Sequence, residues 1–149
     1  MDRTPETRDR AAAYPVRTRL AAAAVALVVV GAGLGLRAVA TGSVAKYGGD
    51  ALYTVLLLSL VVLVAPRTSP LRAAGSALAV SCAVEFLQLS PVPADLSRRS
   101  TVARLVLGST FNPPDLLWYS MGATAGWLVH TAVRSRRVRP APVRDAART

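Results

Sequence analysis

The stretch from Leu71 to Leu89, LRAAGSALAVSCAVEFLQL, decides how the rest of the chain is interpreted. It is apolar or small apart from Arg72 near its start and Glu85 and Gln88 near its end. At a helical rise of about 1.5 Å per residue it covers roughly 27 Å, close to the hydrocarbon thickness that a membrane-spanning helix must match. A charged residue is costly in such a segment, so Glu85 needs an explanation.

The composition of the whole chain is typical of a membrane protein. Of its 149 residues 52% are hydrophobic and only 5% aromatic, and mean hydropathy is positive. The apolar residues are bunched into four blocks, and lipid leaves no partner for open backbone groups, so helices are the expected secondary structure. We predict an all-α, polytopic membrane protein, a bundle of four transmembrane helices at about residues 20–40, 47–65, 71–89 and 113–133.

Basic residues flank these blocks unevenly. Thirteen of the 18 lysines and arginines fall in the two tails and in the loop between the second and third blocks. The positive-inside rule then places both termini in the cytoplasm of a multi-pass protein of the cell membrane. The net charge of +10 therefore needs no nucleic acid as partner. The tails, 1–19 and 134–149, hold too little apolar surface to fold and are predicted to be disordered.

Two segments leave alternatives open. Ala38–Ala40 is similar to a signal-peptide cleavage site, but the long apolar run before it and Arg37 beside it favour an uncleaved first helix. Between the third and fourth blocks, Asp95–Leu107 fits an interfacial helix with Gly108 as its stop, and fits an irregular solvated loop equally well.

In this topology the polar residues of the spans gather at their outer ends. Ionisable residues within a span usually face the bundle interior, a cavity or a partner charge, so we predict one polar site there. Glu85 and Gln88, three residues apart, are expected to share a helix face and to act in function. The candidate residues are Arg37, Lys46, Asp50, Tyr53, Glu85, Gln88, Arg104, Asp115 and Tyr119.

Structural roles compete with this hypothesis. Glu85 could pair with Arg37 or Arg104 and fix the bundle, and Asn112-Pro113-Pro114-Asp115 is typical of a capped helix start. Glycines four residues apart allow helices to approach closely, and this role is assigned to Gly31, Gly35, Gly122 and Gly126. The single cysteine, Cys82, excludes an internal disulfide, and no metal or cofactor site is indicated.

Several motifs together carry a resemblance to a known family. They are GLR at 35–37, KYGGDALY at 46–53, EFLQL at 85–89, RLVLGSTF at 104–111 and DLLWYSMGATAG at 115–126. In this order they resemble an uncharacterised bacterial family of small membrane proteins, the domain of unknown function 2809.

The later motifs are also similar, more distantly, to VanZ-like membrane proteins. Glu85, Gln88 and Asp115 match that family's pattern, as do Gly122 and Gly126, whereas Tyr119 stands where it tends to have asparagine. No histidine accompanies Lys46 and Asp50. The resemblance implies an envelope-facing membrane protein and supplies no reaction.

Three classes of function remain. A binding or accessory protein would hold a membrane lipid, such as an anionic envelope lipid, with cations meeting phosphate and polar groups meeting hydroxyls or amides. An enzyme acting on such a headgroup would use Glu85 or Asp115 as general base. A small transporter subunit would need polar groups through the whole membrane, whereas this sequence confines them to one half. A single four-helix chain is also small for a transporter, and a homo-oligomer could differ.

Overall fold

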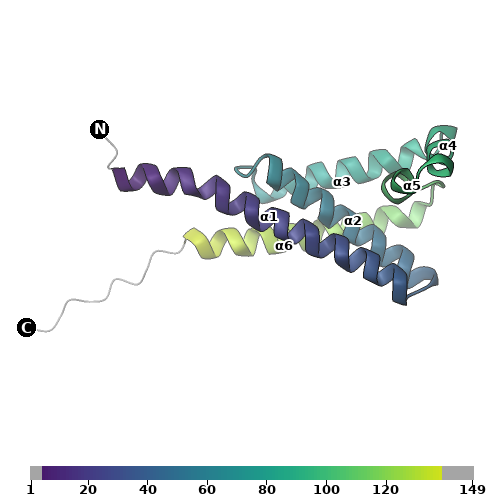
Figure 1. Ribbon diagram of the computed structural model, residues 1–149, viewed down its shortest axis with the longest axis horizontal. Helices are drawn as coiled ribbons and strands as arrows, with labels where there is room; N and C mark the ends of the chain where they lie inside the picture. Colours follow the sequence, from purple (N-terminus) through teal and green to yellow (C-terminus); the bar gives the residue numbers. More distant parts are fainter. Residues whose placement is uncertain (1–4, 139–149) are drawn as a thin grey trace, which may run out of the picture.

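The computed structural model describes residues 5–138, and every regular element within that range is helical (Figure 1). The predicted all-α class is therefore confirmed for the described part of the chain. Four long helices form the body of the molecule, and two short helices stand before the last of them. The elements are α1 (Pro5–Val39), α2 (Gly42–Val64), α3 (Pro70–Leu87), α4 (Pro91–Arg99), α5 (Thr101–Leu107) and α6 (Pro113–Val138).

Prolines and a glycine set where the long helices begin. Pro70 and Pro113 occupy the first positions of α3 and α6, where a missing N–H removes no helical hydrogen bond. Ser69 precedes α3, and its hydroxyl accepts a 3.4 Å hydrogen bond from the backbone N–H of Arg72. Gly42 has φ +62°, a conformation that side chains rarely allow, so the chain turns sharply there. As a result α2 starts at Gly42, earlier than the predicted residue 47.

The segment before α6 differs from both alternatives for Asp95–Leu107, a single interfacial helix and an irregular loop, because it forms the two short helices α4 and α5. It is divided, because Ser100 has an extended backbone and its hydroxyl accepts a 3.3 Å hydrogen bond from the N–H of Ala103, which starts a new helix. Similarly, α3 ends at Leu87 instead of the predicted residue 89.

The described parts of the two tails, which were predicted to be disordered, continue the long helices. Residues 5–19 form the first turns of α1, and residues 134–138 form the last turn of α6. The tails are rich in alanine and arginine, which have high helix propensity and extend the helices that the apolar spans nucleate. Residues 1–4 and 139–149 lie outside the described range.

The helix α2 is the centre of the packing, because it contacts α1, α3 and α6, while α3 also packs against α6. Small residues let these helices approach. A Cβ atom at Gly122 would collide with the backbone carbonyl of Ala51, and one at Gly126 would lie 2.7 Å from Cδ1 of Leu58. Close packing at both glycines agrees with the sequence prediction. The core around them consists of Ala22, Leu58, Val62, Ala73, Ala74 and Ala77.

The same role is wrong for Gly31 and Gly35 within this chain. A Cβ atom at either position would meet nothing within 4 Å. The reason is rotational: α1 buries the face that carries Ala22, Ala26 and Val29, and the two glycines lie on other faces of the helix.

Three helices are long and apolar enough to cross a membrane: Tyr14–Val39 of α1, the whole of α2 and the whole of α3. Large apolar side chains such as Leu27, Val64 and Leu71 are exposed on their outer surface, where a soluble protein would place polar ones. These helices mark the chain as a membrane protein. The fourth predicted span, α6, has 26 residues but is not among the three.

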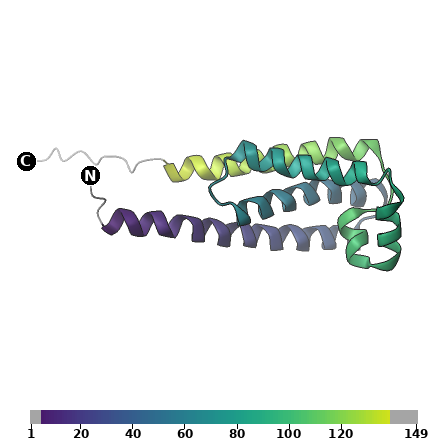
Figure 2. The same ribbon diagram turned by 90° about the horizontal axis from the view of Figure 1, so that it is seen from above.

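The bundle has two distinct ends. The start of α1, the α2–α3 connection and the end of α6 lie at one end, and α4 and α5 lie side by side at the other (Figures 1 and 2). At the first end Arg19 donates to the carbonyl of Leu63 at 3.2 Å and Arg134 to that of Thr68 at 3.0 Å. These arginines satisfy carbonyls at and beyond the end of α2, which the helix leaves unpaired.

Candidate functional site

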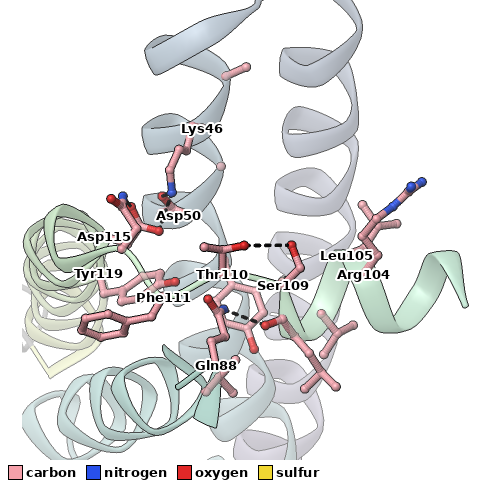
Figure 3. Close-up of a pocket in the computed structure, with 18 of the residues that line it drawn as sticks. Lys46, Asp50, Gln88, Arg104, Leu105, Ser109, Thr110, Phe111, Asp115 and Tyr119 are labelled. Atoms are coloured by element: carbon pink, nitrogen blue, oxygen red, sulfur yellow. Dashed lines mark hydrogen bonds and ion pairs between the residues drawn. The ribbon is translucent and has the colours of Figure 1, made fainter. Parts of the chain in front are cut away.

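A cavity of about 780 Å³ opens at the end of the bundle that carries α4 and α5 (Figure 3). Its walls come from the end of α1, the first turns of α2, the end of α3, α5, the segment 108–112 and the first turns of α6. We call it the polar cavity. Eight of the nine predicted site residues line it: Arg37, Lys46, Asp50, Tyr53, Gln88, Arg104, Asp115 and Tyr119.

Lys46 joins two carboxyl groups on one wall of the polar cavity. Its Nζ lies 2.5 Å from Oδ2 of Asp115 and 3.9 Å from Oδ2 of Asp50, one helical turn further along α2. Asp115 is only 4% exposed, whereas the Lys46 side chain is 45% exposed. Asp115 also lies in the first turn of α6, where the helix dipole favours a negative charge. The lysine therefore offsets the cost of an almost buried acid and stays accessible from the cavity.

Asn112 links the two acidic residues of α3 and α6. Its backbone N–H donates to Oε1 of Glu85 at 2.5 Å, and its side-chain amide donates to Oδ1 of Asp115. The helix starts at Pro113 as the motif predicts, but the Asn112 side chain is not the expected cap, because it donates to a carboxyl group instead of accepting from a backbone N–H. Asn112 fixes the Asp115 carboxyl group in place.

Glu85 lies behind the wall of the polar cavity and does not line it. It is fully buried, at 0% exposed, and its Oε2 accepts a 3.0 Å hydrogen bond from the hydroxyl of Tyr119. The alternative that Glu85 pairs with Arg37 or Arg104 finds no ion pair among the described residues, and Glu85 is not among the residues that line the polar cavity. Both carboxyl oxygens hold wall residues instead, so Glu85 positions Asn112 and Tyr119.

Gln88 diverges from Glu85, although the two were expected to share a face. The helix α3 ends at Leu87, and the Gln88 amide donates to the carbonyl of Leu107 at 2.7 Å, at the end of α5. Gly108 follows, with φ +65°, and a Cβ atom there would lie 2.7 Å from Nε2 of Gln88. The backbone conformation favours glycine, and a Cβ atom there would also force the end of the Gln88 side chain to shift. This contact holds α5 over the polar cavity.

Four polar groups of the cavity form no hydrogen bond among the described residues, although Oδ2 of Asp50 lies 3.9 Å from Nζ of Lys46. Oδ2 of Asp50 and Oε1 of Gln88 are buried acceptors without a hydrogen bond, and buried polar atoms rarely stay unpaired. Among the described residues, Arg37 and Arg104 form no hydrogen bond or ion pair, and in Figure 3 the Arg104 side chain points away from the Lys46–Asp115 pair. The cavity thus offers two guanidinium donors and two acceptors to a ligand.

Two stacked pairs of aromatic rings pack beside the site. Tyr47 stacks on Trp118 with 5.4 Å between ring centroids, and Phe86 stacks on Phe111 at 6.0 Å. The rings join α2 and α3 to the start of α6 and its preceding segment. Sequence reasoning did not assign Asn112 or Phe111 to the site, although both lie just before a proline pair that indicates a helix start. Their role depends on contacts with α3, which the local sequence does not encode.

No group of three or more histidine, cysteine, aspartate or glutamate residues among the described residues could hold a metal ion.

The fold and the cavity together define a helical membrane protein with a polar site at one end of its bundle. The profile of the family described as Protein of unknown function (DUF2809) matches residues 39–123, more than half of the chain, and the chain belongs to this family. All residues that line the polar cavity except Arg37 lie in the matched range. No curated protein and no solved structure matches the chain, and the resemblance to VanZ-like proteins stays a prediction.

Proposed function

We propose that this protein is a binding or accessory protein of the bacterial cell envelope that holds the headgroup of a membrane lipid in the polar cavity. The observation that carries the proposal is position: a cavity with charged walls lies at the end of helices of membrane-spanning length. That end is where the headgroups of a bilayer lie, so a lipid headgroup can enter without crossing the hydrocarbon region.

The proposal includes a topology with four spans and both termini in the cytoplasm. As the fourth span, α6 packs against α2 and α3 and runs alongside both of them in Figure 1. This packing supports a shared depth in the membrane. In this topology the polar cavity faces outward. The short helices α4 and α5 then lie along the interface, with Val92, Leu96 and Val102 toward lipid and Arg98 and Arg99 toward water.

The groups left free in the cavity match the parts of a headgroup. Arg37 and Arg104 suit a phosphate, because a guanidinium donates paired hydrogen bonds to its oxygens. Asp50 and Gln88 suit hydroxyl or amine groups beyond the phosphate. Lys46 contributes charge, but its direct partner within the chain is Asp115.

Measuring the lipid that accompanies the purified protein tests the proposal. The protein is purified in a mild detergent, and phospholipid per mole of protein is determined for the wild type, Arg37→Gln and Arg99→Gln. Arg99 is the matched control, because it is an exposed arginine at the same end that does not line the cavity. We expect about one phospholipid in the wild type and in Arg99→Gln, and markedly less in Arg37→Gln. Equal amounts in both variants would contradict a headgroup site in the cavity.

A second candidate is an enzyme acting on the headgroup. The observation in its favour is the buried Oδ2 of Asp50, which accepts no hydrogen bond and is therefore placed to accept a proton as a general base, with Lys46 at 3.9 Å. The sequence-based choice of Glu85 as base has no support, since its oxygens are engaged behind the wall. Incubating the protein with radiolabelled envelope lipids distinguishes the candidates: an enzyme converts the lipid, and Asp50→Asn stops the conversion while retaining the bound lipid.

Transport has less support. The charged lining gathers at one end, and the cavity of about 170 Å³ between α1, α2 and α6 nearer the other end is lined mostly by apolar residues, with His130 and Arg134 among the exceptions. Assembly into a homo-oligomer stays a proposal that size measurements in detergent can address.

A further inference from the structure

A second hollow adjoins the polar cavity and has the opposite character. It runs between α1, α2 and α5, has a volume of about 280 Å³, and we call it the apolar groove. Its walls beyond the polar cavity are Val29, Val30, Gly33 and Leu34 on α1, Leu52 and Leu56 on α2, and Val102 on α5. No charged residue lines it apart from Arg37. The groove therefore suits a hydrocarbon chain and excludes a polar solute.

The two hollows adjoin each other. The residues that line both of them are Arg37, Gly49, Tyr53, Leu105 and Val106. Arg37 marks the junction, and its guanidinium has no partner among the described residues. In a phospholipid the phosphate lies at the corresponding place, between the headgroup and the acyl chains.

The length of the groove agrees with this arrangement. From Arg37 to Val29 the wall on α1 runs for eight residues, or about 12 Å along the helix axis. One leaflet of a bilayer has about 15 Å of hydrocarbon, half of the roughly 30 Å core. The groove thus covers most of the depth that an acyl chain occupies in its own leaflet.

From these contacts we propose the class of ligand and its orientation, an inference that rests on the proposed function. The site holds one phospholipid with its phosphate at Arg37, its headgroup in the polar cavity and one acyl chain in the apolar groove. The headgroup carries hydroxyl or amine donors, which reach the unpaired acceptors of Asp50 and Gln88. A phosphatidylcholine, which has the same phosphate and chains but no headgroup donor, leaves both acceptors unpaired.

Two glycines of α1 provide a matched pair of variants for the chain. A Cβ atom at Gly33 or at Gly31 would meet nothing within 4 Å, so both positions accept the first atom of a side chain without collision. Leucine is also a better helix former than glycine. Gly33 lines the apolar groove and Gly31 does not. Gly33→Leu therefore fills the groove, and Gly31→Leu adds the same side chain elsewhere on the helix.

The experiment uses the full chain in nanodiscs of phosphatidylglycerol that contain a trace of phosphatidylglycerol with a photoreactive diazirine in one acyl chain. After illumination, cross-linked residues are mapped by mass spectrometry in the wild type, Gly33→Leu and Gly31→Leu. We expect cross-links at residues 29–34 and 52–56 in the wild type and in Gly31→Leu, and about tenfold fewer at these residues in Gly33→Leu. Cross-links spread evenly over the outer surface of the wild type would overturn the placement of the chain, whether or not the variants fold.

A competition measurement tests the headgroup. In nanodiscs of phosphatidylcholine with the same chains, the trace probe should cross-link residues 29–34 and 52–56 about tenfold more efficiently than in nanodiscs of phosphatidylglycerol, because the bulk lipid then competes less for the site. Equal cross-linking in both lipids would overturn the assignment of headgroup donors to Asp50 and Gln88. If the wild type retains phospholipid but Gly33→Leu leaves the cross-links unchanged, only the placement of the acyl chain is rejected. If the wild type binds no phospholipid at all, the proposed function itself is rejected.

Discussion

Replacing Glu85 by alanine should destabilise the protein strongly, although Glu85 does not line the polar cavity. The change leaves the N–H of Asn112 and the hydroxyl of Tyr119 without the oxygens that they reach at 2.5 Å and 3.0 Å. A buried donor that loses its acceptor costs about 1–3 kcal/mol, so the two together cost about 2–6 kcal/mol. Glu85→Gln should cost less than half of this, because the amide oxygen can accept from Asn112 and the amide nitrogen can donate to the phenol oxygen.

The assay is unfolding in mixed micelles, in which the fraction of sodium dodecyl sulfate is raised and tryptophan fluorescence reports the transition. A double-mutant cycle with Glu85→Ala and Tyr119→Phe isolates the bond between the two side chains. We expect a coupling of about 1–2 kcal/mol. If the destabilisations of the two single variants add up to that of the double variant within about 0.5 kcal/mol, the two side chains behave as independent sites. That result would refute the contact and with it the positioning role of Glu85.

Two further predictions concern packing and topology. Gly122→Ala should destabilise the bundle by about 1–3 kcal/mol, because its methyl group collides with a backbone carbonyl of α2. Gly31→Ala should be neutral or slightly stabilising, and similar unfolding curves for the two variants would contradict the packing. The topology is tested by cysteine labelling in a Cys82→Ser background. A cysteine at Ser43 should react with an impermeant maleimide outside intact cells, whereas a cysteine at Ser135 should react only after lysis. The reverse pattern would show that the proposed orientation is inverted.

The positions of the long helices follow from the sequence because lipid imposes a simple rule. Runs of apolar residues must be helical and of a certain length, and short connections make successive helices antiparallel. That rule alone brings residues from distant segments, such as Arg37, Asp50 and Asp115, to one end of the bundle. Their gathering around one cavity could therefore be expected without knowledge of any contact.

The separate role of each residue within the site could not be predicted from the pattern of apolar spans. Glu85 and Gln88 are close in sequence, but α3 ends between them, so one side chain faces α6 and the other α5. Asn112 acquires its role only when the segment before α6 reaches α3. Likewise, nothing in the sequence distinguished Gly31 and Gly35 from Gly122 and Gly126, because the spacing is the same and only the buried face of each helix separates them.

The most direct test of the lipid site is a native mass spectrum of the protein released from detergent, compared with that of Gly49→Leu. Gly49 lines both the polar cavity and the apolar groove, and a Cβ atom there would meet nothing within 4 Å, so a leucine side chain starts without collision and occupies space between the two hollows. We expect the wild type to carry one additional mass of a phospholipid and the variant to fold equally well without it. An identical phospholipid adduct on both proteins would contradict the site.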